Sequence, residues 1–332
     1  MDNKYGEKPL VSIIIPVYNV EKYIQTCLES MVTVIRKSAY ENEIEIICVD
    51  DGSNDESGKI CDSYALKYKN IRVYHNENQG VSRARAFGLS NANGIYVAWC
   101  DADDYFAECW YENVVNILKN NDIDGVVIGY VKKYKDKEKN FCCSIRGIQS
   151  QQEYIYLLSA DDKIKSYLYI HIIKKDILDK CDIDFSLKTY EDYDLLTKVS
   201  MLIDKIYIVN KSLYYYVFRE SSITNTSKPN DLFKAISVAK KRSYTYQSKS
   251  IIYSDAGYWK TLMIYCVKSA CDKHESRRYQ QCKRELRELM INIIFAKELN
   301  FKYKVCLLLL VVFPRRFIGY MWNALKGNLR CM

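Results

Sequence analysis

The chain has 332 residues and is 48% hydrophobic and 13% aromatic, which suits a large globular protein and excludes a disordered chain. Its thirteen cysteines lack CxxC or Cys/His ligand spacing, so they indicate a reducing compartment and exclude a disulfide framework or a zinc site. The apolar run near the N-terminus is too short for export and is interrupted by Pro16, so we expect a cytoplasmic protein.

The net charge of +8 is unevenly distributed. Residues 232–332 carry 20 Lys/Arg and 6 Asp/Glu, a net charge of +14, which leaves −6 for residues 1–231. Such a basic end predicts an anionic partner, either lipid or nucleic acid, or else a solvated basic helix face. The sequence contains no nucleic-acid-binding motif, so we expect no nucleic-acid partner.

The first hundred residues predict strands alternating with helices. Short β-branched runs predict strands at 10–19, 43–50, 71–76 and 95–100. Helical apolar spacing predicts helices at 22–35, from an N-cap at Ser53 or Asp55 to about Tyr68, and at 80–94. This alternation predicts an α/β fold with a parallel, twisted sheet whose ligand site lies at the carboxyl ends of the strands.

Acidic residues follow the second and fourth predicted strands. The segment "WCDADDYF" (99–106) places three carboxylates within four residues, an arrangement that a divalent cation would stabilise. A solvated acidic turn is the alternative, and Asp104 either binds metal or caps the next helix. Because Asp50 and Asp51 end the second strand, both acidic groups are expected to face one crevice with the segment 16–19.

Phosphate-binding glycine motifs are missing from the sequence. Neither GxGxxG after the first strand nor GxxxxGK[ST] occurs, so dinucleotide-binding and P-loop sites are excluded. A metal bound by Asp103, with Arg83 at the start of a helix, could neutralise a diphosphate instead. Arg83 and Arg85 lie on different helix faces, so at most one of them points at the site.

Four segments in this order and spacing carry a resemblance to a known family: "VSIIIPVYNVEKYI", "VDDGSNDES", "NQGVSRARAFGL" and "WCDADDYF". They resemble the nucleotide-sugar glycosyltransferases of family 2, over roughly residues 8–225. The resemblance implies the GT-A fold, a Rossmann-like, mostly parallel sheet flanked by helices. We therefore expect a catalytic domain at 1–229, nucleotide-binding at 8–106 and acceptor-side at 107–229, followed by a basic helical C-terminal extension at 230–332.

The resemblance also implies roles for individual residues. In the family, the positions of Pro16, Tyr18 and Asp50 bracket the nucleoside, usually uridine. Asp101 and Asp103 match the DXD motif, which contacts the ribose and a Mn²⁺ or Mg²⁺ ion on the diphosphate. The expected nucleotide-binding set is Pro16, Tyr18, Asn19, Asp50, Asp51, Arg83 and Asp101, with Asp103 as the metal ligand. Strand ending, packing and turn formation are the structural alternatives for Pro16, Tyr18 and Asp51.

A general base is expected on the acceptor side. The segment "KTYEDYDLLTKV" (188–199) places Glu191 and Asp192 before an amphipathic helix, where the family carries its ED motif. Asp192 is the expected base, and a single base implies direct displacement with inversion. An acidic helix N-terminus stabilised by the helix dipole is the alternative.

Two further segments have a looser match to the family. Where relatives often carry Asn-Lys, this chain has Ile170 and His171, so His171 either contacts an acceptor or is a satisfied structural residue. The segment "LYYYVFRESSIT" (213–224) resembles the one that closes the donor site, which makes Arg219 and Ser222 candidate phosphate contacts. Its alternative is an edge strand with one buried face.

The C-terminal extension combines apolar and basic residues. The run 305–313 is too short to span a bilayer before Pro314 interrupts it. Arg315 and Arg316, followed by aromatic residues, suit an anionic surface at the inner face of the cell membrane. A helix packed onto the catalytic domain is the alternative.

These observations favour an inverting, metal-dependent hexosyl- or N-acetylhexosaminyltransferase. It would move a sugar from a nucleotide diphosphate, expected to be UDP, to a saccharide or lipid-linked acceptor in surface polysaccharide synthesis. The alternatives are a polyprenyl-phosphate sugar transferase of the same fold and a nonenzymatic membrane-binding protein. A phosphoacceptor receiver domain would leave the second carboxylate cluster without a use.

Overall fold

The computed structural model describes residues 8–37, 42–183, 190–219, 229–249 and 251–330. The chain divides into two compact units. An α/β unit consists of residues 1–154 and 163–219, and a helical unit consists of residues 155–162 and 220–332.

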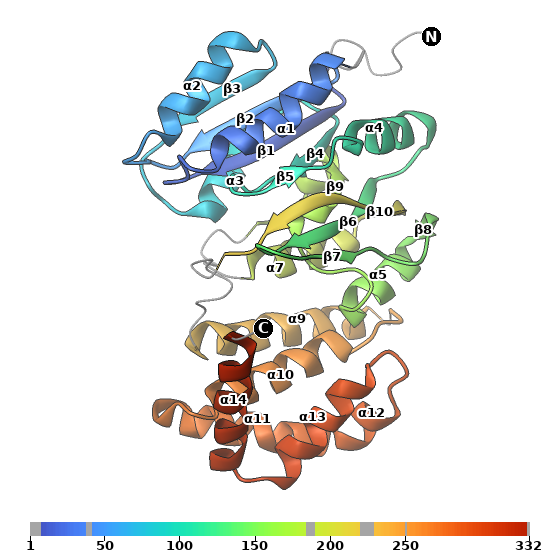
Figure 1. Cartoon of the computed structure of the whole chain (residues 1–332). Helices are drawn as coiled ribbons and strands as arrows, with labels where there is room; N and C mark the ends of the chain where they lie inside the picture. The colour runs from blue at the N-terminus through green and yellow to red at the C-terminus, as the bar shows by residue number, and fades with distance from the viewer. Residues whose placement is uncertain (1–7, 38–41, 184–189, 220–228, 250, 331–332) are drawn as a thin grey trace. The chain divides into compact units, whose positions relative to one another are not determined.

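The described strands of the α/β unit form one sheet in the order β3-β2-β1-β4-β9-β6-β10-β5, with β7 beside β6 and β8 beside β10 (Figure 1). Their bounds are Val11–Val17 (β1), Ile44–Asp50 (β2), Ile71–His75 (β3), Tyr96–Trp99 (β4), Tyr105–Phe106 (β5), Gly125–Lys133 (β6), Glu138–Phe141 (β7), Gly147–Ser150 (β8), His171–Lys174 (β9) and Lys205–Val217 (β10). The predicted α/β class is confirmed by this arrangement.

Strands β1 to β4 are mutually parallel, with β1 between β2 and β4 and with β3 beside β2. The helices that connect them are α1 (Ile24–Lys37), α2 (Ser57–Lys67) and α3 (Val81–Ser90). The four strands and three helices predicted from the apolar periodicity are thus all present in the expected order. A parallel sheet of this kind places the carboxyl ends of its strands at one edge.

Pro16 lies inside β1 and does not end the strand. The pairing of β1 with β4 stops at Ile14 and Trp99, whereas the pairing with β2 continues to Val17 and Asp50. A proline removes a ladder hydrogen bond only where a partner strand faces it. Because β4 has already ended, Pro16 is tolerated in the interior of the sheet.

Helix α3 lies unusually close to β1 because of Gly88. A Cβ atom at this position would lie 2.4 Å from Cγ2 of Ile14, closer than side-chain packing allows. The glycine therefore lets α3 pack directly on the strand. This contact fixes the helix that carries Arg83 and Arg85.

The second half of the sheet mixes directions. Strand β9 runs antiparallel to β4 and β6, and β10 is parallel to β6 but antiparallel to β5 and β8. The helices in this region are α4 (Trp110–Asn120), α5 (Gln151–Ala160), α6 (Lys175–Leu178) and α7 (Glu191–Ser200), with a short 3₁₀ turn at Leu168–Ile170.

The triple-tyrosine run belongs to β10, which has partner strands on both sides, so the edge-strand alternative is wrong. Tyr214 in this run is fully buried.

The helical unit is built around α10. Its helices are α9 (Pro229–Ser248), α10 (Ala256–Ser269), α11 (Ser276–Glu288), α12 (Met290–Phe295), α13 (Phe301–Val312) and α14 (Arg315–Arg330), with a 3₁₀ turn at Lys273–Glu275. Helices α9, α11, α13 and α14 all contact α10, whose Leu262, Tyr265 and Cys266 are completely buried. Among the residues described, no helix has both the length and the apolar content that crossing a membrane requires.

Candidate active site

The sequence-predicted site residues follow strands that end at the same edge of the sheet. Val17 at the end of β1 pairs with Asp50 at the end of β2. Asp101 and Asp103 follow β4, which also pairs with β1. The topology thus brings three of the predicted segments to one edge, as the parallel arrangement requires.

Asp50 is held rigidly at the end of β2. It is buried, its Oδ1 accepts from the backbone N–H of Ser53 at 3.0 Å, and its Oδ2 lies 2.9 Å from Nδ1 of His75. The other ring nitrogen of His75 lies 3.0 Å from Asp62. The hydrogen bond to Asp50, together with the one to Asp62, raises the pKa of His75 despite partial burial. His75 was not predicted as a site residue, because no local sequence pattern links it to Asp50.

Asp51 anchors the loop that precedes α3. Its Oδ1 and Oδ2 accept from the backbone N–H groups of Gln79 and Gly80 at 2.9 and 2.8 Å, and the residue is buried. Both carboxylate oxygens are therefore used by this loop. These hydrogen bonds favour a structural role for Asp51. The role is to hold the loop before α3, and not to form the turn at Gly52 and Ser53 that directly follows Asp51.

Tyr18 and Asn19 extend from the end of β1. The Tyr18 side chain is 46% exposed, which leaves its ring available for stacking. Asn19 has a left-handed φ of 50°, its N–H donates to Ser53 Oγ at 3.1 Å, and its Oδ1 accepts from the N–H of Asn54 at 2.9 Å. Asn19 thus ties together the loops that follow β1 and β2.

Arg85 joins three carboxylates at the centre of the candidate site. Its Nη2 donates to Asp101 Oδ1 at 2.7 Å, and its Nη1 contacts Glu191 Oε1 at 2.9 Å and Asp192 Oδ1 at 3.3 Å. The Arg85 side chain is only 12% exposed. Burial opposes its positive charge, but the carboxylates outweigh this effect and raise the pKa of the guanidinium. One side chain therefore connects the residues after β4 with the start of α7.

The pKa of the Asp192 carboxyl is shifted toward neutral pH. Burial raises the pKa of its carboxyl to about 7; Arg85 lowers the pKa, while Glu191 raises it. Its Oδ2 also accepts from the backbone N–H of Leu168 at 3.2 Å. A carboxylate that titrates near neutral pH can both take up and release a proton under working conditions.

The structure distinguishes the two arginines of α3. Arg85 is the one that contacts the carboxylates, whereas Arg83 is exposed and donates to Gln79 Oε1 at 3.3 Å. From the sequence, at most one of the two arginines was expected at the site, and Arg83 was named as a nucleotide contact. Helical phase turns Arg85 toward Asp101. Nucleotide binding by Arg83 stays a prediction.

Asp103 forms an ion pair with Arg219, which follows β10. The Asp103 side chain is 32% exposed, and the guanidinium carbon of Arg219 lies 4.5 Å from the centre of the Tyr23 ring. Burial lowers the pKa of Arg219, while Tyr23 and Asp101 oppose this shift. The predicted metal ligand and a predicted phosphate contact are thus neighbours. The other predicted phosphate contact, Ser222, lies outside the described residues.

Asp104 fastens the turn after β4 to β10. Its Oδ2 accepts from the Tyr214 hydroxyl at 2.8 Å, and its Oδ1 accepts from the backbone N–H of Val217 at 2.8 Å. Burial, reinforced by Asp101, raises the pKa of the Asp104 carboxyl well above its usual range, although both hydrogen bonds oppose the shift. Asp104 neither caps α4, whose N-cap is Cys109, nor faces solvent as a metal ligand.

His171 lies in β9 and is completely buried. Its Nδ1 donates to the backbone carbonyl of Tyr167, with 2.8 Å between the two atoms. A side chain closed to solvent does not reach an acceptor sugar. Of the two alternatives for His171, the structure therefore supports the structural one.

The donor set limits how a divalent cation could bind. Within the described parts of the chain, no group of three or more His, Cys, Asp or Glu side chains is placed to hold a metal. Mg²⁺ and Mn²⁺ are often held by one or two carboxylates together with substrate phosphates and water. The partly exposed Asp103 and Asp101 fit that arrangement, in which the substrate supplies the remaining oxygens.

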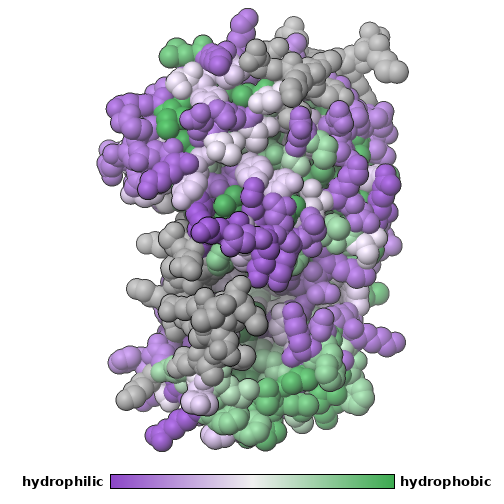
Figure 2. Space-filling model, viewed as in Figure 1, coloured by the Kyte–Doolittle hydropathy of each residue, from purple (hydrophilic) through white to green (hydrophobic). Residues whose placement is uncertain are grey.

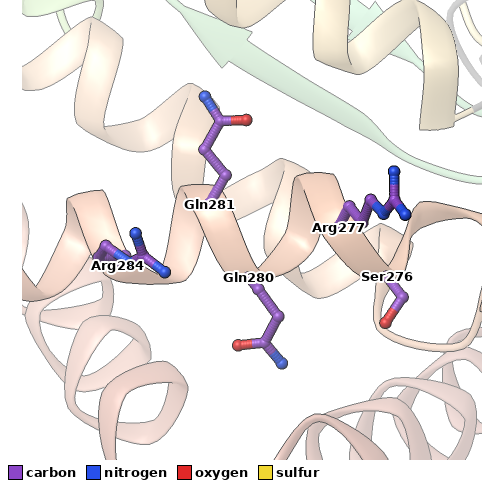
Figure 3. Close-up of a pocket in the computed structure, with 5 residues that line it drawn as sticks. All are labelled: Ser276, Arg277, Gln280, Gln281 and Arg284. Atoms are coloured by element: carbon purple, nitrogen blue, oxygen red, sulfur yellow. The ribbon is translucent and has the colours of Figure 1, made fainter.

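The helical unit contains a shallow cavity of about 330 Å³ on α11. Its lining consists of Ser276, Arg277, Gln280, Gln281 and Arg284. Figure 3 shows Gln280 and Gln281 pointing to opposite sides of the helix. Functional sites gather polar groups that converge on a ligand, and these side chains do not converge. We therefore place the candidate site at the cluster formed by Arg85, Asp101, Glu191 and Asp192, which we call the Arg85 cluster.

Known proteins similar to this chain were found by sequence and by structure. The profile of Glycosyl transferase family 2 matches residues 12–144. Glycosyltransferase GlyG of Streptococcus pneumoniae serotype 4 is 34% identical over 229 residues, which cover 65% of this chain and 73% of GlyG. The minor teichoic acid biosynthesis protein GgaB of Bacillus subtilis is 35% identical over 228 residues, which cover 66% of this chain but only 24% of GgaB.

Solved structures of S. aureus TarS share the fold. Residues 1–349 of TarS superpose with a TM-score of 0.60 at 18% identity, covering 95% of this chain and 91% of that chain. The complex of the same fragment with UDP-GlcNAc gives a TM-score of 0.61. This likeness confirms the GT-A type of fold with its helical C-terminal region.

Proposed function

The chain belongs to glycosyltransferase family 2, and on this premise we propose that it transfers a sugar from a UDP donor to a saccharide or lipid-linked acceptor with inversion. The observation that carries the proposal is the Arg85 cluster, which connects the donor-side Asp101 to the acceptor-side Asp192. Sugar transfer needs the residues that bind the donor and the base that deprotonates the acceptor within reach of the same anomeric carbon.

The nucleoside end of the donor is assigned to the edge formed by β1 and β2. The exposed ring of Tyr18 can stack on a flat base, and Asp50 is fixed beside it by Ser53 and His75. The UDP-GlcNAc and UDP complexes of TarS support a uridine donor, because TarS has the same fold. An N-acetylhexosamine is accordingly the first donor sugar to test.

The diphosphate is assigned to the residues after β4. Asp103 and Asp101 would hold a Mn²⁺ or Mg²⁺ ion, and that ion supplies charge compensation for the departing diphosphate. Arg219 lies beside Asp103 and can exchange this ion pair for contact with a phosphate oxygen. The chain's own part is to hold these two carboxylates in place through Arg85 and Arg219.

The acceptor hydroxyl is assigned to Asp192. In its ionised form, Asp192 takes the proton from the hydroxyl at Oδ1 or Oδ2 as the oxygen attacks the anomeric carbon. Arg85 contacts Oδ1 and the Leu168 N–H contacts Oδ2, so both oxygens have fixed positions. Arg85 is thus a positioning residue that fixes the place of the proposed base, Asp192, relative to Asp101.

Synthesis of a surface polysaccharide or teichoic acid is the proposed setting. GgaB, which shares 35% identity with this chain over the aligned residues, is a minor teichoic acid biosynthesis protein. A polyprenyl phosphate acceptor is the other outcome that an acceptor screen should include.

The test combines donor binding with turnover. UDP with Mn²⁺ should raise the melting temperature of the protein, and the effect should require both components. A screen of UDP-linked hexoses and N-acetylhexosamines should then reveal metal-dependent release of UDP. Asp192→Asn should keep the binding and lose the release. Absence of any nucleotide-dependent stabilisation would refute the proposed donor class.

A further inference from the structure

Helix α13 exposes an apolar stripe on the outside of the helical unit. Phe301, Val305, Leu308 and Val312 recur at helical spacing and are all exposed, with Phe301 at 77% and Val312 at 70%. The opposite side of α13 is buried through Leu307 and Leu310, which pack within the unit. A helix that is apolar on both sides needs a second apolar environment beyond the one it already packs against.

The apolar surface continues onto the neighbouring helices. Helices α12 and α14 both contact α13, and their exposed apolar side chains are Ile291, Phe295, Phe317 and Tyr320. Figure 2 shows this hydrophobic surface gathered at the bottom of the view, where Figure 1 places α12 and α13. We call these eight residues of α12, α13 and α14 the apolar face. Contiguous exposed apolar surface of this kind marks an interaction site.

The charged residues of the segment that carries the apolar face are mostly basic. Residues 289–332 contain seven Lys/Arg and one Asp/Glu. The single acidic residue, Glu298, accepts from the Tyr156 hydroxyl at 2.5 Å, and this hydrogen bond lowers the pKa of Glu298. Lys297, Lys302 and Arg316 are exposed. The partner must therefore combine an apolar interior with an anionic surface.

Arg315 does not belong to this basic set. Its guanidinium donates to the backbone carbonyls of Ser269, at 2.9 Å, and of Asp272, and it lies over the Tyr279 ring. Arg315 thus fastens the start of α14 to the rest of the helical unit. The sequence pairs Arg315 with Arg316, but only Arg316 lies at the surface.

We propose that the apolar face inserts into the interface of an anionic phospholipid membrane, with Lys297, Lys302 and Arg316 binding the headgroups. An interfacial segment of this composition buries apolar side chains at the acyl boundary and places Lys and Arg among the phosphates. A second copy of the chain is disfavoured as the occupant, because a symmetric contact would bring two basic surfaces together. The proposal goes beyond sugar transfer and is tested without it.

The test measures co-sedimentation of the full chain with vesicles. Wild type should bind vesicles of mixed phosphatidylglycerol and phosphatidylcholine, and it should bind pure phosphatidylcholine more weakly. High salt should weaken binding without abolishing it, because salt screens charges but not apolar contacts. Failure of the wild type to bind anionic vesicles would overturn the proposal.

Two double variants separate the contributions. Phe301→Gln with Val312→Gln should lower the partition coefficient onto anionic vesicles at least about tenfold, since it removes two inserting side chains. Lys297→Gln with Lys302→Gln should lower it severalfold at low salt and make little difference at high salt. Both pairs are exposed, so the melting temperature should change little.

The matched control lies in the α/β unit, where Leu66→Gln in α2 with Lys69→Gln just after this helix removes an exposed apolar and an exposed basic residue. Leu66 is 91% exposed. The control should bind vesicles like the wild type. If it loses as much binding as the apolar-face variant, or if that variant instead abolishes a concentration-dependent dimer seen by light scattering, the membrane assignment is wrong.

Discussion

The ends of β2 and β4 both carry adjacent aspartates, but they use their carboxylates differently. At the end of β2, the oxygens of Asp51 are taken up by two backbone amides, and the residue is buried. After β4, Asp101 and Asp103 pair with arginine side chains and remain 31% and 32% exposed. A backbone amide cannot move away without breaking the loop, whereas an arginine side chain can exchange its partner for a ligand.

This difference supports a structural role for Asp51 and the proposed ligand contacts of Asp101 and Asp103, while Asp50 keeps its proposed place beside the nucleoside. It also divides the cluster after β4 itself, because Asp104 is buried and bound by Tyr214 and Val217. Aspartates that are neighbours in the sequence thus differ in burial and in the groups that their carboxylates contact. Substitutions at each position test this division.

The largest effect is expected at the far end of the Arg85 cluster. Asp192→Asn keeps the shape of the side chain but removes the base, so the rate of sugar transfer should fall by roughly two to four orders of magnitude. UDP binding should persist, because the donor residues are untouched. Turnover close to that of the wild type would move the base elsewhere, with Glu191→Gln the next variant to measure.

The next largest effect is expected at Asp103, the partly exposed carboxylate after β4. Asp103→Ala removes a metal ligand, so Mn²⁺-dependent UDP affinity should fall by about two orders of magnitude, which corresponds to the loss of a charged contact. Titration calorimetry with UDP and Mn²⁺ measures it. Asp136→Ala, at an exposed position, is the control and should bind normally. Unchanged affinity in Asp103→Ala would reject this residue as the metal ligand.

A smaller effect is expected from substituting Arg85, which lies between Asp101 and Asp192. Transfer should increase as pH rises through about 7, because Asp192 acts only when ionised. Arg85 lowers the pKa of Asp192, so Arg85→Gln should move this limb of the pH profile to higher pH and reduce the rate at pH 7 by about tenfold.

Arg85→Lys is the conservative partner of that variant. It keeps a positive charge but loses the planar guanidinium that donates through both Nη1 and Nη2. The rise of the transfer rate with pH should therefore stay near its original pH, while kcat falls more than KM changes. A merely structural role for Arg85 would lower the melting temperature of both variants and leave the pH profile of the folded fraction unchanged.

The smallest effect on the reaction is expected at the end of β2. Asp51→Ala leaves the amides of Gln79 and Gly80 without their acceptor and should destabilise the protein by about 1–3 kcal/mol. Thermal or urea unfolding measures this loss. Well below the melting temperature, UDP affinity should change less than about threefold. A larger loss of affinity in the folded protein would make Asp51 a ligand and erase the contrast between the two strand ends.

The amino-acid sequence alone determined the first half of the fold and the chemical type of the site. The periodicity of the first hundred residues correctly predicted β1 to β4 and α1 to α3, because alternation and helical spacing are local properties of the chain. Parallel strands place their carboxyl ends together, so the order of elements was enough to predict that Asp50 and Asp101 follow strands that end at one edge of the sheet. Strands β5 to β9 were not predicted, and β10 was considered only as an edge strand, since the pairing of these strands depends on partners far apart in the sequence.

Only the tertiary structure decided which residues meet. Arg85 reaches Asp192 across 107 residues, and no local pattern distinguishes it from Arg83. The burial of Asp104 depends in the same way on Tyr214, which lies 110 residues further along the chain. The apolar stripe on α13 could be recognised as exposed only after Leu307 and Leu310 were found to face inward. Composition and spacing encode which elements form, whereas through-space partners decide whether a given carboxylate, arginine or apolar side chain is buried, paired or open to a ligand.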